Sequence, residues 1–185
     1  MSDKIPLAFH SDSEAQPFKS CKVCDLDLTD GRTPYSIEKA LKRTSEGEDL
    51  TLFELAICMN CAEKQAQKMS KESKEFIEKT MMTESFMTKR QEIWENDWNK
   101  NWNRSCIFSN QAVKINEEYH IVGHFIGNRV LPNQTPFLIG KEMIDYVQEN
   151  LSEETKGEMD DFGRQFLGPD PRIAALLEDY QLVFL

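Results

Sequence analysis

The sequence predicts an α+β protein built from a tandem pair of β-hairpin–helix units that a long helix joins. One observation behind this prediction is the presence of two Cys-x-x-Cys pairs, which are Cys21 with Cys24 and Cys58 with Cys61. The other is a match of the chain with itself at offsets of 82 to 85 residues. An offset of this size is larger than that of solenoid repeats and is typical of a duplicated small domain.

Composition and patterning divide the chain of 185 residues into five segments. These are a flexible lead-in over 1–17, a first unit over 18–80, a connecting helix over 81–103, a second unit over 104–162 and a tail over 163–185. The lead-in is polar and lacks hydrophobic periodicity. The tail contains a short apolar helix over 172–177 and a strand over 182–185, and we expect it to dock on the body of the protein.

The first unit reads as strands followed by a helix. Apolar residues alternate with polar ones over 26–41, as in half-buried strands, and Asp30-Gly31 supplies a turn. A further strand over 51–57 leads to the second cysteine pair. From Ala62 onward the residues are strong helix formers, so this pair is expected at the start of a helix.

Four thiolates in two closely spaced pairs are the ligand set of a tetrahedral zinc site. Two other uses of paired cysteines fit less well. A thioredoxin-like redox pair follows a strand of a βαβ unit, and no βαβ pattern surrounds either pair. A disulfide framework needs an oxidising compartment, and residues 1–6 lack the features of a signal peptide. We therefore expect one structural zinc ion and a cytoplasmic protein.

The order of a cysteine pair, a β-hairpin and a second pair that opens a helix resembles the treble-clef and zinc-ribbon-like class of four-cysteine zinc fingers. The resemblance covers about residues 18–80 and implies that Cys21, Cys24, Cys58 and Cys61 are the zinc ligands. The 33 residues between the pairs exceed the spacing of compact examples. Because this class serves many functions, the resemblance implies a fold and a metal rather than an activity.

The second unit retains one of the four ligand positions. In the self-match, Cys21-x-x-Cys24 falls on Cys106-x-x-Ser109, and the strand before Cys58 falls on the strand before Gly140. Met143 then falls on the position of Cys61. One thiolate cannot hold a zinc ion, so this copy is predicted to be metal-free and stabilised by apolar packing.

A row of tryptophans marks the connecting helix. Trp94, Trp98 and Trp102 recur at intervals of four and therefore lie along one helix face. Three indole rings carry a large apolar area, and they are expected to pack against the second unit. The alternative is an exposed stripe that binds a partner protein or a second copy of the chain.

The histidines and the fifth cysteine are the best catalytic candidates, but we expect no catalytic site. His120 and His124 lie on one face of a predicted strand, about 13 Å apart by strand rise, which is too far for both to bind one metal ion unless the strand bends. Cys106 could act as a nucleophile beside either histidine, with Glu117 or Glu118 near it. The sequence supplies neither an identifiable orienting acid nor an oxyanion site for this arrangement.

Charge and hydropathy limit the classes of partner that the chain is expected to bind. The chain has 22 basic and 32 acidic residues, a formal net charge of −10, and its only basic nucleus is Lys39 with Lys42 and Arg43. This excess of acidic residues disfavours binding to nucleic acid. No apolar run is long enough to span a bilayer. The sequence therefore predicts a non-enzymatic zinc protein that acts as an adaptor or regulatory module for a protein partner. A zinc-finger regulator of nucleic acid and a small enzyme using Cys106 remain the alternatives.

Overall fold

The computed structural model describes residues 4–96 and 98–167 and contains one five-stranded antiparallel sheet. The strands are β1 (Pro34–Arg43), β2 (Asp49–Cys58), β3 (Glu118–Ile126), β4 (Arg129–Val130) and β5 (Phe137–Gly140). Their order is β2-β1-β3-β4. β5 also pairs directly with β3, along residues 119–122, whereas the short β4 pairs with residues 125–126. The helix and strand predicted within the tail, at 172–177 and 182–185, lie outside the described residues.

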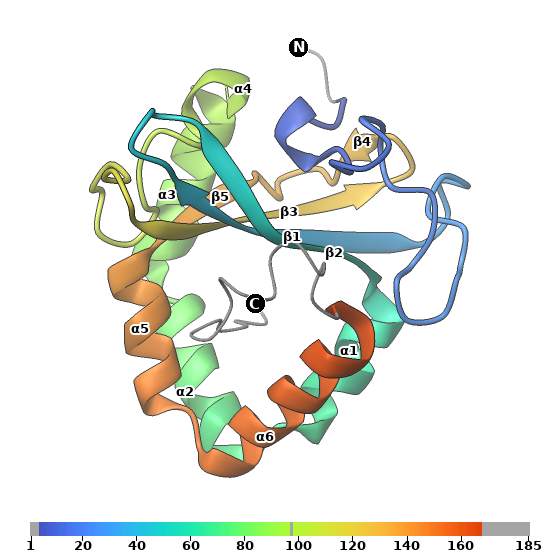
Figure 1. Cartoon of the computed structure of the whole chain (residues 1–185), viewed down its shortest axis with the longest axis vertical. Helices are drawn as coiled ribbons and strands as arrows, with labels where there is room; N and C mark the ends of the chain where they lie inside the picture. The colour runs from blue at the N-terminus through green and yellow to red at the C-terminus, as the bar shows by residue number, and fades with distance from the viewer. Residues whose placement is uncertain (1–3, 97, 168–185) are drawn as a thin grey trace.

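The chain also forms helices, several of which cover one face of this sheet. The helical segments are η1 (Leu7–Phe9), α1 (Met59–Lys68), α2 (Lys71–Met81), α3 (Glu84–Glu95), α4 (Trp98–Asn101), α5 (Lys141–Asn150), α6 (Glu153–Phe162) and the π-helical turn η2 (Gly163–Leu167). Figure 1 shows α1, α2, α5 and α6 below the sheet, whereas η1 lies on the opposite face. Within the described part of the chain, none of the helices combines the length and hydropathy needed to cross a bilayer.

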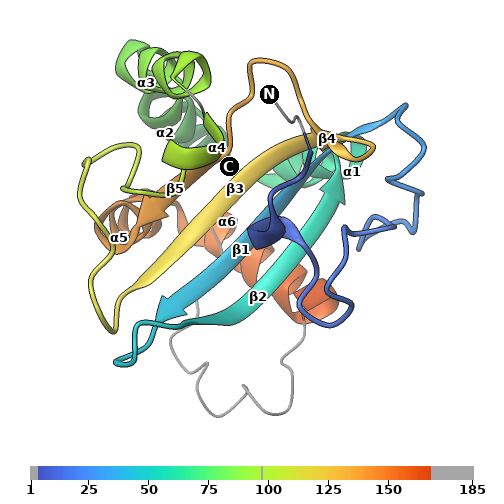
Figure 2. The same cartoon turned by 90° about the horizontal axis from the view of Figure 1, so that it is seen from above.

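The two central strands come from different halves of the chain and pair with each other. β1 and β3 are antiparallel neighbours, and Glu38 pairs with Val122, 84 positions later. The same interval separates Tyr35 from Tyr119 on these strands. Each central strand pairs outward with the strand that leads into a helix, β2 before α1 and β5 before α5 (Figure 2).

The first strand begins later than the alternation over 26–41 predicts. Between residues 21 and 33 the backbone makes turns and one isolated bridge, from Ser20 to Asp27, and β1 starts at Pro34. The side chain of Asp27 accepts hydrogen bonds from the N–H and the hydroxyl of Thr29, and Asp30 accepts one from the N–H of Arg32. These local bonds compete with a strand ladder, so the segment forms turns.

The connecting segment over 81–103 is divided rather than one long helix. α2 ends at Met81, and the hydroxyl of Thr83 accepts a hydrogen bond from the N–H of Phe86 to start α3. The side chain of Asn96 donates to the carbonyl of Glu92 at the other end of α3. Capping residues within the segment therefore separate α2, α3 and α4.

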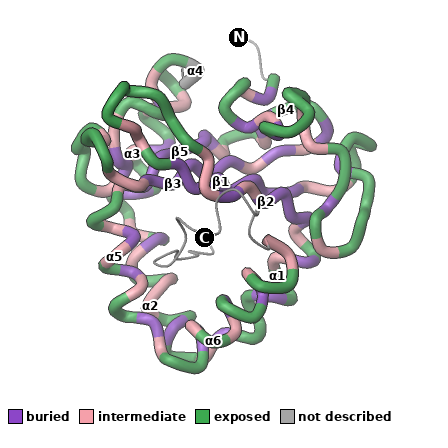
Figure 3. The backbone as a smooth tube through the Cα atoms, in the orientation of Figure 1, coloured by how far each residue is buried: buried purple, intermediate pink, exposed green. Residues whose placement is uncertain are grey.

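Both faces of the sheet are buried at its centre, as the purple strands of Figure 3 show. β1 is buried along most of its length, not half-buried as alternation predicts, because helices cover one face and the N-terminal segment covers the other. On the second face the ring of Phe9 lies 5.1 Å from that of Phe125 and 5.0 Å from that of Trp102. A separate apolar cluster packs α5 onto β3 and β5 through Ile144, Val147, Val122 and Ile139.

Four hydroxyl groups join the helices of the two halves. Ser70 and Ser152 cap α2 and α6. The N–H of Ser70 donates to Thr155 Oγ1 over 3.0 Å, and the N–H of Ser152 donates to Ser73 Oγ over 3.0 Å. The Ser152 hydroxyl donates to Ser70 Oγ over 2.9 Å. The residue that caps α2 thus bonds to the first turn of α6, and the residue that caps α6 bonds to the first turn of α2.

Gly123 in β3 has no space for a larger side chain. A Cβ at this position would lie 2.5 Å from Cζ of Phe125 and 3.1 Å from Cζ of Phe9. We expect Gly123→Ala to lower the free energy of unfolding by about 1–3 kcal/mol, because the aromatic rings must shift. Chemical denaturation measures this change. In the control, Gly157→Ala in α6, the new Cβ meets nothing within 4 Å, and stability should rise by about 0.5–1 kcal/mol. Equal stability of wild type and Gly123→Ala would contradict this packing.

Candidate metal centre

The first cysteine pair lies on a closed turn that is attached to β2. The N–H of Cys21 donates to the carbonyl of Leu26, and the N–H of Asp25 donates to the carbonyl of Cys21, each over 2.9 Å. Asp25 has a left-handed φ of 58°, which aspartate tolerates better than most residues. The N–H of Lys22 donates to the carbonyl of Ala56 over 2.9 Å. This bond holds the turn against the strand that carries the second pair.

The second pair lies where β2 passes into α1, as the helix-forming residues after it predict. Cys58 is the last residue of β2 and the N-cap of α1, and Cys61 lies in the first helical turn. The N–H of Cys58 also donates to Sγ of Cys21 over 3.4 Å. Free N–H groups and the positive end of the helix dipole therefore lie near the sulfurs, where they favour thiolates.

The structure brings the four predicted ligands together. The sulfur atoms of Cys21, Cys24, Cys58 and Cys61 all lie within 4.8 Å of one another, and those of Cys24 and Cys58 are 3.8 Å apart. A tetrahedral site with metal–sulfur bonds of about 2.3 Å has sulfurs about 3.8 Å apart. All five cysteines are free, and a disulfide would need about 2 Å between sulfurs. The donor set and its spacing fit one metal ion.

The thiols differ in their readiness to ionise. Burial raises the pKa of Cys58 and that of Cys61 above the ordinary value of 9.0. Burial also opposes ionisation of Cys21, but backbone N–H groups, led by that of Cys58, bring its pKa below 9.0. A bound divalent cation would stabilise all four thiolates and so overcome the burial cost. Cys24 is exposed, so one corner of the site faces solvent.

Cys106 lies on a turn with the same backbone bonds as the Cys21 turn. Its N–H donates to the carbonyl of Gln111, and the N–H of Asn110 donates to its carbonyl, each over 2.8 Å. Asn110 has a φ of 59°. The N–H of Ile107 donates to the carbonyl of Leu138 in β5 over 2.9 Å. Each donor or acceptor lies 82 or 85 positions after its counterpart in the first turn.

The positions around Cys106 hold no second thiol. A Cβ at Gly140, the N-cap of α5, would lie 3.4 Å from Cβ of Cys106. The ammonium of Lys89 in α3 donates to the carbonyls of Ile107 and Phe108, over 2.9 and 3.2 Å. Lys89, which the sequence did not single out, thus attaches the Cys106 turn to α3.

The tryptophans do not form one exposed stripe among the described side chains. Trp102 is 3% exposed and packs on Phe9. Trp94 in α3 is partly buried beside a cavity. The side chain of Trp98 lies outside the described residues. The ring contact of Trp102 is thus with the N-terminal segment, whereas Trp94 has a partly accessible surface, and packing of the row against the second unit stays a prediction.

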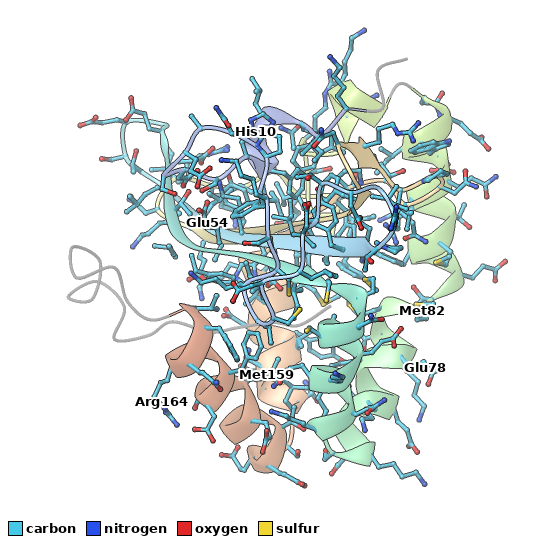
Figure 4. The ribbon with its side chains drawn as sticks, turned by 90° about the vertical axis from the view of Figure 1, so that its right-hand side faces the viewer. His10, Glu54, Glu78, Met82, Met159 and Arg164 are labelled. Atoms are coloured by element: carbon cyan, nitrogen blue, oxygen red, sulfur yellow. The ribbon has the colours of Figure 1, made fainter. Side chains whose placement is uncertain are left out.

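The predicted basic nucleus is largely neutralised. Lys39 is 2% exposed, and its ammonium contacts Asp12 Oδ1 at 2.5 Å and Glu54 Oε2 at 3.2 Å. It also donates to the carbonyl of His10, and Figure 4 shows His10 and Glu54 on the side of the sheet away from the helices. Arg43 pairs with Asp49 at 3.0 Å. Of the three basic residues, Lys42 alone is exposed.

His120 is held between two carboxylates inside the sheet. Its Nδ1 lies 2.8 Å from Glu38 on β1, and its Nε2 lies 3.3 Å from Glu118. Burial opposes the charge, but the hydrogen bonds to Glu118 and Glu38 raise the pKa of His120 to about 9. The partnership with Glu38 depends on the β1–β3 register, which the sequence did not predict. Both ring nitrogens are occupied, so neither is available to Cys106.

His124 has the opposite electrostatic environment. Burial, together with the positive charge of Arg90, lowers its pKa to about 4. Its Nδ1 is buried and has no hydrogen-bond partner in the described part of the protein. The histidine is therefore neutral near pH 7. Within the residues described, no hydrogen bond joins Cys106 to His120 or His124.

We expect the free energy of unfolding to be greatest near pH 6.5, the ordinary pKa of histidine. The folded-state pKa of His120 is raised, so its contribution is full below pH 6.5 and is lost as the pH rises through about 9. The folded-state pKa of His124 is lowered, so its contribution to the free energy of unfolding is lost as the pH falls from 6.5 through about 4. The loss of stability on the alkaline side and that on the acid side, here called the alkaline and acid limbs, should each amount to roughly 2–4 kcal/mol.

Urea denaturation of the metal-loaded protein across this pH range measures both limbs. His120→Gln should flatten the alkaline limb and His124→Gln the acid limb, whereas His10→Gln on the N-terminal segment is the matched control. An alkaline limb that persists unchanged in His120→Gln would show that another group causes it.

The four cysteines are the predicted site residues that the structure gathers around one point. Among the described residues, no other group of three or more histidine, cysteine or acidic side chains is placed to hold a metal ion. Comparisons with protein-family models, curated proteins and solved structures found no match for this chain.

Proposed function

We propose that this protein is a non-enzymatic cytoplasmic zinc protein whose single zinc ion stabilises a treble-clef-like unit over residues 18–80. The observation that supports it best is the gathering of four cysteine sulfurs within 4.8 Å, three of them on buried residues. Zinc suits an all-thiolate tetrahedral site, and a site with four protein ligands leaves no open position for catalysis. The ion would therefore stabilise the fold and would not take part in a reaction.

The proposal includes a duplication, with residues 104–162 as a metal-free copy of 18–80. The matching bonds of the Cys21 and Cys106 turns support it, as do the reciprocal caps at Ser70 and Ser152. The ammonium of Lys89 donates to the carbonyls of Ile107 and Phe108 and so attaches the Cys106 turn to α3 without a metal. Loss of metal with retention of the backbone is expected when a scaffold presents a surface and does not carry out chemistry.

A protein partner fits this scaffold better than the two alternatives do. Burial and pairing of Lys39 remove most of the positive patch that a nucleic acid would need. His120, with both nitrogens bonded to carboxylates, is not placed to activate Cys106. Trp94 and Met87, which is 47% exposed, supply accessible apolar surface on α3. We infer that this part of α3 contacts the partner.

Affinity capture with the full metal-loaded chain tests the interaction. Trp94→Ala should lose the captured protein, because aromatic anchors contribute a large share of binding energy. Tyr146→Ala on α5 is the matched control, since Tyr146 is an aromatic residue that is 49% exposed on another helix. Retention of the partner by Trp94→Ala, or its loss from both variants, would contradict a binding surface at α3.

A further inference from the structure

A cavity of about 330 Å³ lies between α3 and the connection from β4 to β5. Its lining residues are Met87, Arg90, Gln91, Trp94, Glu95 and Asn133. This volume falls at the lower end of the range for small-ligand sites, which combine an apolar wall with a few polar groups. Here Trp94 and Met87 supply the apolar wall, and Arg90 supplies a positive charge.

Arg90 is 8% exposed, and its guanidinium lies 5.5 Å from the ring centre of Phe86 and 5.0 Å from that of Phe137. Its Nε and Nη2 both donate to the carbonyl of Thr135, over 3.2 and 3.0 Å. A guanidinium has five N–H donors, so three are left without an acceptor in the described chain. Burial lowers the pKa of Arg90 to about 10, which leaves it charged at pH 7.

No carboxylate among the described residues lies within ion-pair distance of Arg90. Glu95 lines the same cavity, but its carboxylate accepts a hydrogen bond from Gln91 Nε2 over 2.8 Å. The neighbouring His124 is neutral and supplies no countercharge. A buried cation without an anion is costly, and this cost is unusual in a chain of net charge −10.

Part of this side chain has a structural role. Arg90 and Thr135 bond reciprocally, since the Thr135 hydroxyl donates to the carbonyl of Arg90 over 3.0 Å. That contact attaches the connection before β5 to α3, but it uses one carbonyl, and neither it nor the two aromatic rings supplies a negatively charged partner. A structural role therefore accounts for two of the five donors.

We propose that this cavity binds an organic carboxylate with an apolar or aromatic body. The carboxylate accepts hydrogen bonds from the free N–H groups of Arg90, which suit the bidentate geometry of a carboxylate. The body of the ligand packs on Trp94 and Met87. The carboxylate comes either from a free small acid or from an acidic side chain of a protein, and the chemistry at Arg90 is the same for both.

The test is a titration of the full metal-loaded chain, followed by NMR at the Arg90 Nε–H and the indole N–H of Trp94. The probes are phenylacetate, its neutral analogue phenylacetamide, and the capped dipeptide acetyl-Phe-Glu-amide. Phenylacetate or the dipeptide should shift both signals saturably, with a Kd of about 1 mM or less, and phenylacetamide should bind at least about tenfold more weakly. The tighter of the two acids identifies the source of the carboxylate.

Asn133→Asp provides a variant that leaves the Arg90–Thr135 contact in place. Asn133 has a φ of 59°, which aspartate also tolerates, and the substitution adds a carboxylate to the cavity wall. It should weaken binding of either acid at least about tenfold through like-charge repulsion and competition for Arg90. Asn116→Asp, an exposed residue with a φ of 64°, makes the same charge change elsewhere and should leave binding unchanged.

Three results would overturn the proposal. They are the absence of saturable binding by either acid, equal affinity for phenylacetate and phenylacetamide, and unchanged affinity in Asn133→Asp.

Discussion

Cys58→Ser is expected to abolish stoichiometric zinc binding and to unfold the first turn and the β2–α1 junction. Cys58 contributes one of the four sulfurs, ends β2, caps α1, and donates its N–H to the sulfur of Cys21. Structural zinc sites contribute roughly 10 kcal/mol or more in small zinc-finger domains, whereas whole domains are stable by about 5–15 kcal/mol. Loss of the ion should therefore remove most of the stability of residues 18–80.

Hydrogen exchange measures this effect residue by residue. Protection should fall most at the Cys21 turn and at the start of α1, in Cys58→Ser and in wild type treated with a chelator. Cys106→Ser is the matched control, because Cys106 is buried but lies on the turn without a four-sulfur cluster. It should retain the metal. Unchanged protection of residues 18–80 after metal removal would mean that the ion does not stabilise the fold.

The triple variant Ser109→Cys, Gly140→Cys, Met143→Cys is expected to raise the metal content from one ion per chain to two. The Cys106 turn has the same backbone bonds as the Cys21 turn, and Gly140 and Met143 fall on the positions of Cys58 and Cys61. The space at Gly140 accepts a Cβ at ordinary contact distance from Cys106. Four thiols should then meet at the start of α5, as they do at the start of α1.

Native mass spectrometry counts the ions in this variant. The same three substitutions combined with Cys106→Ser leave three thiols and should bind one ion less tightly or not at all at the second position. Circular dichroism of each variant shows whether it folds. A folded triple variant that still binds a single ion would contradict the duplication of the metal site.

Local patterns in the sequence identified the four cysteines that the structure brings together. The two Cys-x-x-Cys pairs lie on turns whose geometry depends on nearby residues, and the helix after Cys61 follows from helix-forming residues. The strand boundary at Pro34 was missed because side-chain bonds of Asp27 and Asp30 favour turns, a competition that alternation does not reveal. The two cysteine pairs could therefore be predicted as one site from local patterns, whereas the first strand between them was predicted to begin at residue 26 and begins at Pro34.

Long-range contacts could not be predicted in the same way. The pairing of β1 with β3 places Glu38 beside His120 across 82 positions, and no local pattern encodes that register. Arg90 has the sequence context of an exposed helical residue, and its burial arises from packing of α3 on Phe137 and Thr135. Such residues become visible only when distant segments are assembled.

Native mass spectrometry of the purified wild-type chain, combined with cysteine alkylation, is the most direct test of the metal centre. We expect the mass of the chain plus one zinc ion, with Cys21, Cys24, Cys58 and Cys61 protected from alkylation until a chelator is added. Protection of Cys24 is the sharpest observation, because its side chain is exposed and would otherwise react. A folded, metal-free chain whose Cys24 reacts at once would contradict the zinc site.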